Sequence, residues 1–379
     1  MSKGVKKRIV YVPLEPYKER YTVQLSAKDG WLESNWKREG HDVIRIDGTS
    51  ISDDNDIKTG QVLDAHGRGY WACSQVMELI KLHQLGMLNP VTDVIYFDDF
   101  WHPGISALPY MFDQTNSHIP AFAMLHAQSV DIHDFTYPMR HWMRHFEKGI
   151  ATFLSGIFVT SSCLYDLCLY AGVGTKENIY LAGLPYNSRE VKNQFFPEVL
   201  PAKKKQVVYS SRWDREKRPD FFLQVVKEVY KRRPDINFVI TTSAAEVRSN
   251  DQNMVKLLER FIATEEAARN LEVRVGQTKH QYYHNLLESK IQFNCADQDF
   301  VSWTLLEATT SGCRPVYPNY LSFPEALQYR YELMYNKDEV ESAVKKIIDH
   351  IDEEPKDWSW VYGWFDKSWE RMTEYMGRF

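Results

Sequence analysis

The sequence predicts an α/β protein built from two Rossmann-like domains, and three observations predict this class. Short apolar runs alternate with amphipathic helical patterns along the chain, as in parallel sheets that are covered by helices. The chain has 379 residues, a length that is long for one domain and suits two. A stretch with many charges and two prolines, residues 188–205, separates two such α/β series and is expected to be the interdomain linker.

The first series gives an N-terminal domain, residues 1–190. Its strands are expected at 9–12, 42–46, 94–97, 121–125, 157–161 and 179–181, with helices at 31–39, 75–85 and from 162 onward. The second series gives a domain over 205–357. Its strands are expected at 206–209, 238–241, 273–275, 291–294 and 315–317, and its helices at 219–232, 254–270, 280–288 and 304–311. The tail, about 358–379, carries Trp358, Trp360, Trp364 and Trp369 and predicts a helix that crosses back to the first domain.

Composition excludes some functional classes. The 46 basic and 51 acidic residues give a net charge of −5, which argues against a surface that grips nucleic acid everywhere but leaves room for a local basic patch. No window approaches the roughly 20 apolar residues of a membrane span. The apolar run Ile9–Val12 is also too short for a signal peptide. The five cysteines are odd in number and lack metal-ligand spacing, so we expect reduced thiols in a cytoplasmic protein.

Candidate chemistry is expected in the loops that follow strands, because ligands of open parallel sheets bind at the carboxyl ends of the strands. Two such sheets that face each other would form an interdomain cleft. After the strand 206–209 come Arg212 and Lys217, followed by Pro219 at the start of a helix. Two cations near a helix N-terminus suit a diphosphate, on which negative charge grows as a sugar leaves. The alternative is a charged, solvated loop.

The second candidate segment opens the helix at 304–311. Asp299 lies in the preceding loop and Glu307 lies inside the helix, among Leu305, Leu306 and Ala308. A carboxylate in this position can accept hydrogen bonds from the hydroxyl groups of a nucleotide sugar. The backbone amides at the helix start, near Ser302, Trp303 and Thr304, would face a bound phosphate. The alternative is an amphipathic helix with one solvent-facing Glu.

Together these segments resemble the nucleotide-sugar half of GT-B glycosyltransferases, in particular the retaining family-4 type. The matching spacings are Arg212/Lys217 and Asp299/Glu307, with Ser311-Gly312 at the helix end. The resemblance implies that Arg212 and Lys217 hold the diphosphate, Glu307 the ribose and Asp299 the sugar. It implies a UDP-sugar as co-substrate, no required cofactor or metal, and retention of the anomeric configuration.

The resemblance extends to other segments. Gly276, with Tyr283 further on, falls where the family contacts the nucleobase, and His126 falls where it has a strand-end His near the transferred sugar. The turn Gly40-His41 resembles the family's first helix-to-strand turn. Two positions depart from the pattern, because the first acidic residue is Asp299 rather than Glu and Ser211 replaces a Gly. These departures leave the sugar and the exact geometry open.

Two short acidic motifs allow another interpretation. Asp98-Asp99 and Asp297-Gln298-Asp299 resemble the metal-binding acidic motif of GT-A enzymes. Two successive α/β halves fit GT-B better, so no metal is expected. Asp98 and Asp99 close a strand, which suits a role on the acceptor side, and helix capping is the alternative.

The acceptor side is expected in the N-terminal domain. The loop after the first strand carries Glu15, Glu19, Arg20 and Tyr21 and resembles bacteriophage glycosyltransferases, including those that modify hydroxymethylated pyrimidines in DNA. Residues 139–146, with Arg140 and Arg144, interleave cations with aromatic side chains, as a phosphate backbone and an extruded base would require. An ordinary amphipathic helix with a basic face is the alternative.

The sequence therefore predicts a glycosyltransferase whose donor is a UDP-sugar. The first hypothesis for its acceptor is a hydroxymethylated pyrimidine in double-stranded phage DNA, which would place the enzyme in the host cytoplasm. A glycan or lipid-linked acceptor is the competing hypothesis. A nucleotide-sugar epimerase of the same layout and a non-catalytic binding module are alternatives from other classes. The oligomeric state stays open.

Overall fold

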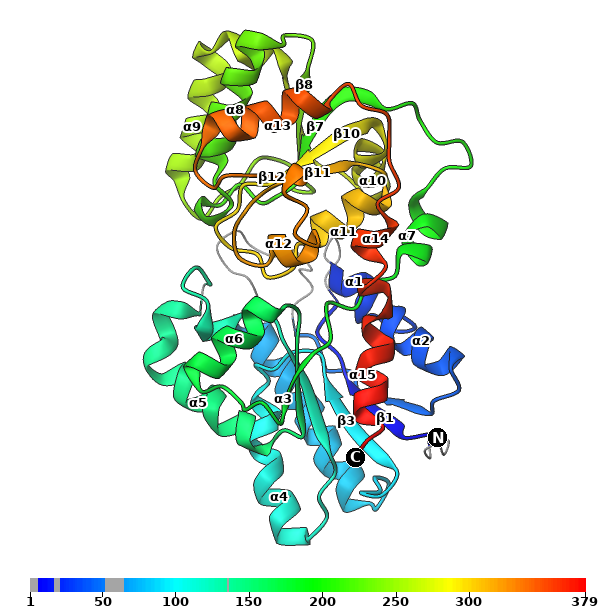
Figure 1. Ribbon diagram of the computed structural model, residues 1–379. Coiled ribbons are helices and arrows are strands. Elements are labelled where there is room, and N and C mark those ends of the chain that lie inside the picture. The colour runs from blue at the N-terminus through cyan, green and yellow to red at the C-terminus, as the bar shows by residue number, and fades with distance from the viewer. Residues whose placement is uncertain (1–5, 17–20, 52–64, 135) are drawn as a thin grey trace. The chain divides into compact units, whose positions relative to one another are not determined.

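The computed structural model describes residues 6–16, 21–51, 65–134 and 136–379, and for Tyr21 and Ala65 it describes the backbone alone. The chain divides into two compact units (Figure 1). Unit 1 comprises residues 1–186 and 367–379, and unit 2 comprises residues 187–366. Each unit is described by itself below.

Unit 1 is built on a six-stranded parallel sheet with the strand order β2-β1-β3-β4-β5-β6. The strands are β1 (Arg8–Val12), β2 (Val43–Arg45), β3 (Asp93–Phe97), β4 (Ala121–Leu125), β5 (Gly156–Val159) and β6 (Ile179–Leu181). Every residue of β3, β4 and β5 is buried. Such continuous burial is typical of a parallel sheet with helices on both faces, and it explains why these strands are uniformly apolar in sequence.

Helices cover this sheet. They are α1 (Tyr21–Leu25), α2 (Trp31–Arg38), α3 (Ala65–Gln84), α4 (Leu108–Thr115), α5 (Arg140–Phe153) and α6 (Ser162–Ala171), with short 3₁₀ turns η1 (Pro103–Ala107), η2 (Gln128–Val130) and η3 (Tyr137–Met139). Helix α6 shows how local sequence sets the ends. The Ser161 side chain accepts a hydrogen bond from the Leu164 amide, and Gly172 ends the helix with φ +68°.

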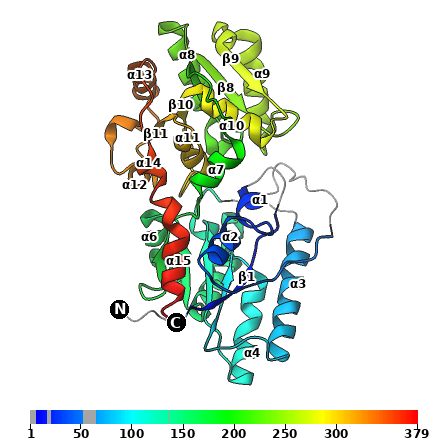
Figure 2. The same ribbon diagram turned by 90° about the vertical axis from the view of Figure 1, so that its right-hand side faces the viewer.

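The C-terminal segment belongs to unit 1. Helix α15 (Ser368–Met376) packs on the sheet of unit 1, and Figure 2 shows it beside α2 and β1. The Trp36 indole donates to the Thr373 hydroxyl over 2.8 Å, and the Tyr180 and Tyr375 rings stack with their centroids 4.4 Å apart. Aromatic contacts and hydrogen bonds therefore hold the last helix on the unit that begins the chain.

Unit 2 is built on a second six-stranded parallel sheet, ordered β12-β11-β10-β7-β8-β9. Its strands are β7 (Lys204–Tyr209), β8 (Asn237–Thr241), β9 (Leu271–Arg274), β10 (Ser289–Phe293), β11 (Arg314–Pro318) and β12 (Met334–Tyr335). The helices are α7 (Ser188–Phe195), α8 (Pro219–Arg232), α9 (Gln252–Thr264), α10 (Lys279–Glu288), α11 (Trp303–Thr310), α12 (Phe323–Ala326), α13 (Val340–His350) and α14 (Ser359–Tyr362). Turns η4 (Arg215–Lys217), η5 (Glu266–Asn270), η6 (Tyr331–Leu333) and η7 (Phe365–Lys367) complete the elements.

The predicted fold class, two Rossmann-like α/β domains, is confirmed by these two parallel sheets. Three segments differ from expectation. Helix α3 begins ten residues earlier than the predicted 75–85, because burial of residues such as Trp71 and Ala72 outweighs the low helix propensity of Gly67 and Gly69.

The expected linker 188–205 is the second difference. Residues 188–195 form α7 and belong to unit 2, because the Asn187 side chain accepts from the Glu190 amide and Ser188 donates to the Asp366 carboxylate. The tail is the third difference. It is two helices, α14 and α15, rather than one, and the chain passes between the units at residues 366 and 367.

Candidate functional site in unit 2

The loops at the carboxyl edge of the unit 2 sheet bring most of the predicted donor residues together. Arg212 follows β7, and its side chain is 55% exposed. The guanidinium pairs with Asp214 at 3.3 Å and with Glu216 at 2.8 Å. An exposed ion pair of this kind contributes little free energy. The Arg212 guanidinium can therefore turn toward an anionic ligand with little loss of stability.

Lys217 lies deeper at the same edge. Its side chain is largely buried, and the ammonium donates to the Gln298 carbonyl and lies 3.8 Å from Asp299 Oδ1. The 3₁₀ turn η4 ends at Lys217, and Arg218 then takes a left-handed conformation, φ +53°, before Pro219 opens α8. The two loops that follow β7 and β10 thus place one cation and one carboxylate side by side, as the sequence predicts.

Glu307 lies on the first turns of α11 and is buried. Its carboxylate accepts hydrogen bonds from the Tyr282 hydroxyl at 2.7 Å and the Tyr283 hydroxyl at 3.0 Å, and it lies 3.4 Å from the Lys279 ammonium. Burial, and then the Glu307 charge, raise the pKa of Tyr282, so its hydroxyl stays a donor at neutral pH. Sequence reasoning missed Lys279 and placed Tyr282, with Tyr283, only in the nucleobase region. Nothing in their spacing shows that α10 and α11 pack together.

The start of α11 holds the other predicted donor residues. Ser302 precedes the helix, and its hydroxyl lies 2.7 Å from that of Thr304 without capping the first turn. Trp303 is the first helical residue. The amides of the first turn therefore keep the partial positive charge of a helix N-terminus, which suits an anion.

Gly276 lies in the turn between β9 and α10. It takes φ +62°, and no atom lies within 4 Å of the place where a side chain would begin. Glycine adopts this conformation without strain. Tyr283 lies below the surface on the neighbouring helix, where its ring stacks on Phe195 with centroids 4.6 Å apart. The backbone at Gly276 is thus open to a ligand, whereas Tyr283 acts on the site through Glu307.

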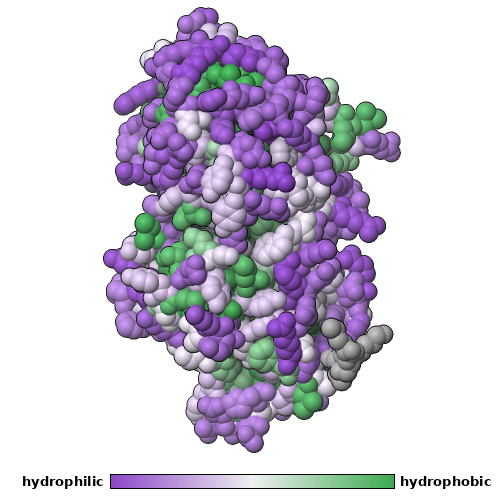
Figure 3. Space-filling model, viewed as in Figure 1, coloured by the Kyte–Doolittle hydropathy of each residue, from purple (hydrophilic) through white to green (hydrophobic). Residues whose placement is uncertain are grey.

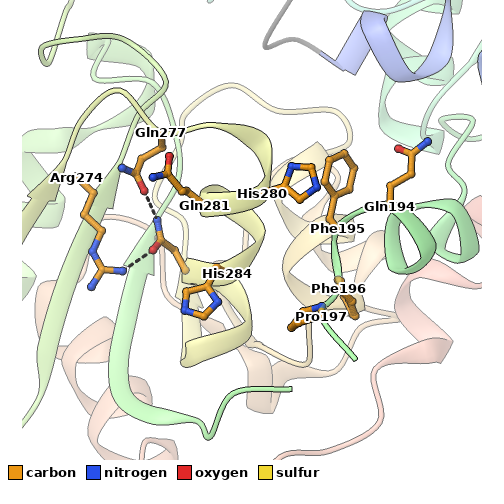
Figure 4. Close-up of a pocket in the computed structure, with 10 residues that line it drawn as sticks. Gln194, Phe195, Phe196, Pro197, Arg274, Gln277, His280, Gln281 and His284 are labelled. Carbon is orange, nitrogen blue, oxygen red and sulfur yellow. Dashed lines mark hydrogen bonds between the residues drawn. The ribbon is translucent and has the colours of Figure 1, made fainter. Parts of the chain in front are cut away.

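A pocket of about 650 Å³ adjoins this turn. Figure 4 shows Gln277 and Arg274 on one side of it, with Phe195 and His280 on the other. Asn285 donates to Gln277 over 3.1 Å and accepts from Arg274. The residues that line the pocket are Gln194, Phe195, Phe196, Pro197, Arg274, Gln277, His280, Gln281, His284 and Asn285. Amides and aromatic rings give this pocket hydrogen-bonding and stacking groups together.

The predicted acceptor residues of unit 1 lie at the carboxyl edge of its own sheet. His126 follows β4, and its Nε2 lies 3.1 Å from the Asp98 carbonyl oxygen. The Asp98 carboxylate is buried and accepts from Tyr11, Ser26 and Tyr96 and from the Leu14 amide. Asp98 therefore has a structural role at this edge of the sheet.

Asp99 contacts Arg68, a residue that sequence reasoning did not single out. Its carboxylate accepts from the Trp101 amide at 3.0 Å, from Gln128 at 3.2 Å and from Arg68 at 3.2 Å. Arg68 is buried, and its Nε and Nη1 groups have no hydrogen-bond partner among the described residues. Buried guanidinium groups almost always satisfy their donors. Two unsatisfied donors therefore mark Arg68 as a group that a ligand could complete.

The remaining acceptor candidates are placed as follows. Glu15 accepts from Ser50 at 3.1 Å. Glu19 and Arg20 lie outside the described residues, as does the side chain of Tyr21. Arg140 is exposed on α5, whereas the Arg144 guanidinium donates to the Ser129 carbonyl. Among the described residues, no group of three or more His, Cys, Asp or Glu side chains could hold a metal ion.

Comparison with known proteins shows what unit 2 resembles. Residues 190–363, which lie in unit 2, match the family model of glycosyl transferases group 1. The matched range takes in both loops that hold Lys217 and Asp299 and also helix α11 with Glu307. Within the described residues, no helix is both long and apolar enough to cross a membrane, and the face shown in Figure 3 is mostly hydrophilic.

Known proteins resemble this chain in sequence or in fold. The tRNA-queuosine alpha-mannosyltransferase of Drosophila melanogaster is 26% identical over 140 residues, which are 37% of this chain and 34% of that protein. The chain thus matches about a third of that relative's length. Sucrose-phosphate synthase from Thermosynechococcus elongatus has a TM-score of 0.63 at 12% identity, over 98% of this chain and 94% of that one. Anabaena HepE, solved with UDP and glucose, has a TM-score of 0.57 at 10% identity, over 97% and 95% of the two chains. These structures share the GT-B fold.

Proposed function

We propose that this chain is a glycosyltransferase that moves a sugar from a UDP-sugar to the hydroxyl group of a hydroxymethylated pyrimidine in double-stranded DNA, with retention of configuration. The observation that carries the donor half is the cluster of Lys217, Asp299 and Glu307 at one edge of the unit 2 sheet. A phosphate-binding cation, a sugar-binding carboxylate and a ribose-binding carboxylate are the groups that a nucleotide sugar needs.

The diphosphate is assigned to Lys217 and Arg212, with the α11 amides near Ser302, Trp303 and Thr304. Lys217 is already held in place by the Gln298 carbonyl and Asp299, so it needs little reorganisation as negative charge develops on the leaving group. Arg212 is exposed and can follow the ligand. Preorganised charge of this kind stabilises the transition state more than the ground state.

The nucleoside is assigned to Glu307 and to the Gly276 turn. Glu307 would accept from the ribose diol, while Tyr282 and Tyr283 keep its carboxylate oriented. The uracil ring would approach the open backbone at Gly276, next to the pocket of Figure 4. Structural support for this donor class comes from HepE, which was solved with UDP and glucose.

Asp299 and His126 are assigned to the transferred sugar. Retention follows from the resemblance to family-4 enzymes, and we propose front-face displacement. The bond from the anomeric carbon to the phosphate oxygen breaks while the acceptor oxygen bonds to the same face, and the leaving phosphate oxygen takes the acceptor's proton. An inverted product would refute this mechanism.

The acceptor is assigned to unit 1, with Asp99, Arg140 and the loop at Glu15 and Tyr21. The fly relative is named a tRNA-queuosine alpha-mannosyltransferase, and this name supports a modified nucleoside of a nucleic acid as the acceptor. A hydroxymethylated pyrimidine in DNA is likewise a modified base of a nucleic acid. Five free cysteines and a nucleic-acid acceptor fit an enzyme of the cytoplasm, or of the host cytoplasm for a phage enzyme.

The test is a UDP-release assay with a panel of UDP-sugars and several acceptors. The acceptors are unmodified duplex DNA, duplexes with hydroxymethylcytosine or hydroxymethyluracil, tRNA that contains queuosine, an oligosaccharide, and none. UDP release only with a hydroxymethylated duplex, together with a hexose or pentose mass gain on that base, would support the proposal. Release with tRNA or the oligosaccharide instead would overturn the DNA acceptor, and interconversion of donor sugars alone would indicate an epimerase.

A further inference from the structure

Helix α5 of unit 1 presents a face that carries positive charge, imidazole rings and an indole. Its buried side is formed by Met143, Glu147, Ile150 and Ala151. The exposed side chains of the helix include Arg140, His141, Trp142, His145 and Lys148, which we name the α5 basic face. The helix contains one acidic residue, Glu147, and it lies on the buried side. No carboxylate of α5 therefore neutralises this face.

Glu147 and Arg144 are used inside unit 1. Glu147 is fully buried and accepts from the amide of Ser129 at 3.1 Å and from its hydroxyl. Arg144 donates to the Ser129 carbonyl. Both side chains thus fix the loop that leaves β4, in which His126 lies. Arg144 positions this loop and is not part of the α5 basic face.

The described residues of the loop before α5, 131–134 and 136–139, include no exposed acidic side chain. Asp131 is buried and accepts from the His133 amide at 3.0 Å, and Asp134 accepts from the Thr136 amide at 2.8 Å. His133 itself is exposed. The carboxylates of this loop are therefore turned toward its own backbone, and the exposed groups beside α5 are again basic or neutral.

Two side chains of the α5 basic face are arranged for contact with a nucleic acid. The Arg140 guanidinium lies 4.2 Å from the Tyr137 ring centroid and donates to the Tyr137 carbonyl over 3.0 Å. Stacking holds the guanidinium plane and leaves its other N–H groups free for phosphate oxygens. Trp142 is 44% exposed, and an exposed indole is a stacking surface for a base.

The α5 basic face also lies next to the edge that receives the acceptor in the proposed function. Ser129 joins α5 to η2, and the Gln128 side chain of η2 donates to Asp99 over 3.2 Å. Arg140 and Lys148 are eight residues apart, about 12 Å along a helix axis. That distance matches about three to four phosphate steps along one strand, at roughly 3.4 Å each.

We propose that the α5 basic face binds the phosphate backbone of duplex DNA beside the base that accepts the sugar, with Arg140 and Lys148 on phosphates and Trp142 on an unpaired base or sugar. This inference rests on the proposed function and deepens it. The chain as a whole has a net charge of −5, so the electrostatic attraction between the protein and DNA has to be local. Reversing the charges of the α5 basic face therefore removes this attraction.

The experiment measures binding of a labelled duplex by fluorescence anisotropy over a range of salt concentrations. The test variants are Arg140→Glu/Lys148→Glu and Trp142→Ala. The matched control is Lys231→Glu/Lys345→Glu, which reverses two exposed lysines of unit 2. We expect the α5 double variant to weaken binding by at least about tenfold and to lower the slope of log Kd against log salt by about 2. We expect Trp142→Ala to weaken binding by about fivefold or more.

Several outcomes would overturn this surface assignment. They are unchanged binding by the α5 variants, an equal loss in the control, and preferential binding of tRNA over the duplex. UDP binding and sugar transfer to a free hydroxymethylated nucleoside are measured on the same proteins. α5 variants that keep wild-type DNA binding would refute the surface alone. A wild type that binds UDP but neither binds DNA nor modifies it would refute the acceptor as well.

Discussion

The Tyr282 hydroxyl donates a 2.7 Å hydrogen bond to Glu307 Oε2, and this contact joins α10 to the carboxylate that is assigned to the ribose. We expect Tyr282→Phe to lower UDP affinity about tenfold, because a hydrogen bond to a charged group contributes about 1.5–3 kcal/mol and Glu307 keeps its Tyr283 and Lys279 contacts. Glu307→Gln should lower affinity further. Titration calorimetry with UDP measures both, and Tyr329→Phe, at an exposed tyrosine of unit 2, is the control. Equal affinities for Tyr282→Phe and wild type would show that Glu307 needs no orientation by α10.

Lys217 is the cation most firmly placed for the leaving diphosphate. We expect Lys217→Ala to lower kcat about 100- to 1,000-fold at saturating donor, the typical loss when one transition-state donor is removed. The melting temperature should change little, because its neighbour Asp299 is partly exposed and can be solvated. Lys231→Ala removes an exposed lysine as a control. A loss confined to KM would mean that Lys217 binds the ground state and transition state equally.

The prediction for the acceptor side concerns Arg68. Its Nε and Nη1 groups are buried without a partner in the described part of the chain, which is costly unless a ligand supplies acceptors. We expect Arg68→Gln to raise the KM of the acceptor about tenfold or more and to leave UDP affinity unchanged, as the loss of one charge-assisted hydrogen bond predicts. Initial rates with varied acceptor measure this effect, with the exposed Arg378→Gln as control. If only the melting temperature falls, Arg68 is a structural partner of Asp99.

Most of the fold could be predicted because its signals are local. Strands such as β4 are continuous apolar runs, and Pro219 marks the start of α8 in the sequence as it does in the structure. Helix α7 could not be predicted in this way. Ser188 is fixed by Asp366, and Phe195 by Tyr283, and both partners lie far along the chain. Charged residues and prolines therefore look like a linker until the tertiary contacts are known.

In the donor site, too, local signals could be predicted from the sequence and tertiary contacts could not. Lys217 and Asp299 could be predicted because each lies in a loop that follows a strand, and parallel strands bring their carboxyl ends to one edge. The contacts of Lys279 and Tyr282 with Glu307, and of Arg68 with Asp99, could not, because helix packing alone creates them. A buried Arg has no spacing signal in a single sequence.

Glu353 gives a prediction about stability and pH in unit 2. The neighbouring Lys356 ammonium, with His350 and Arg314, lowers the pKa of Glu353 to about 2 from its ordinary 4.5. A carboxyl group whose pKa is lower in the folded state stabilises the fold above its unfolded pKa, and this contribution is lost as the pH falls through the folded pKa. We therefore expect the melting temperature of wild type to fall between about pH 4.5 and pH 2 more steeply than that of Glu353→Gln. The control is Glu354→Gln, one residue along and exposed, which should follow the wild-type curve. Parallel curves for wild type and Glu353→Gln would show that this ion cluster contributes nothing to the acid sensitivity of the fold.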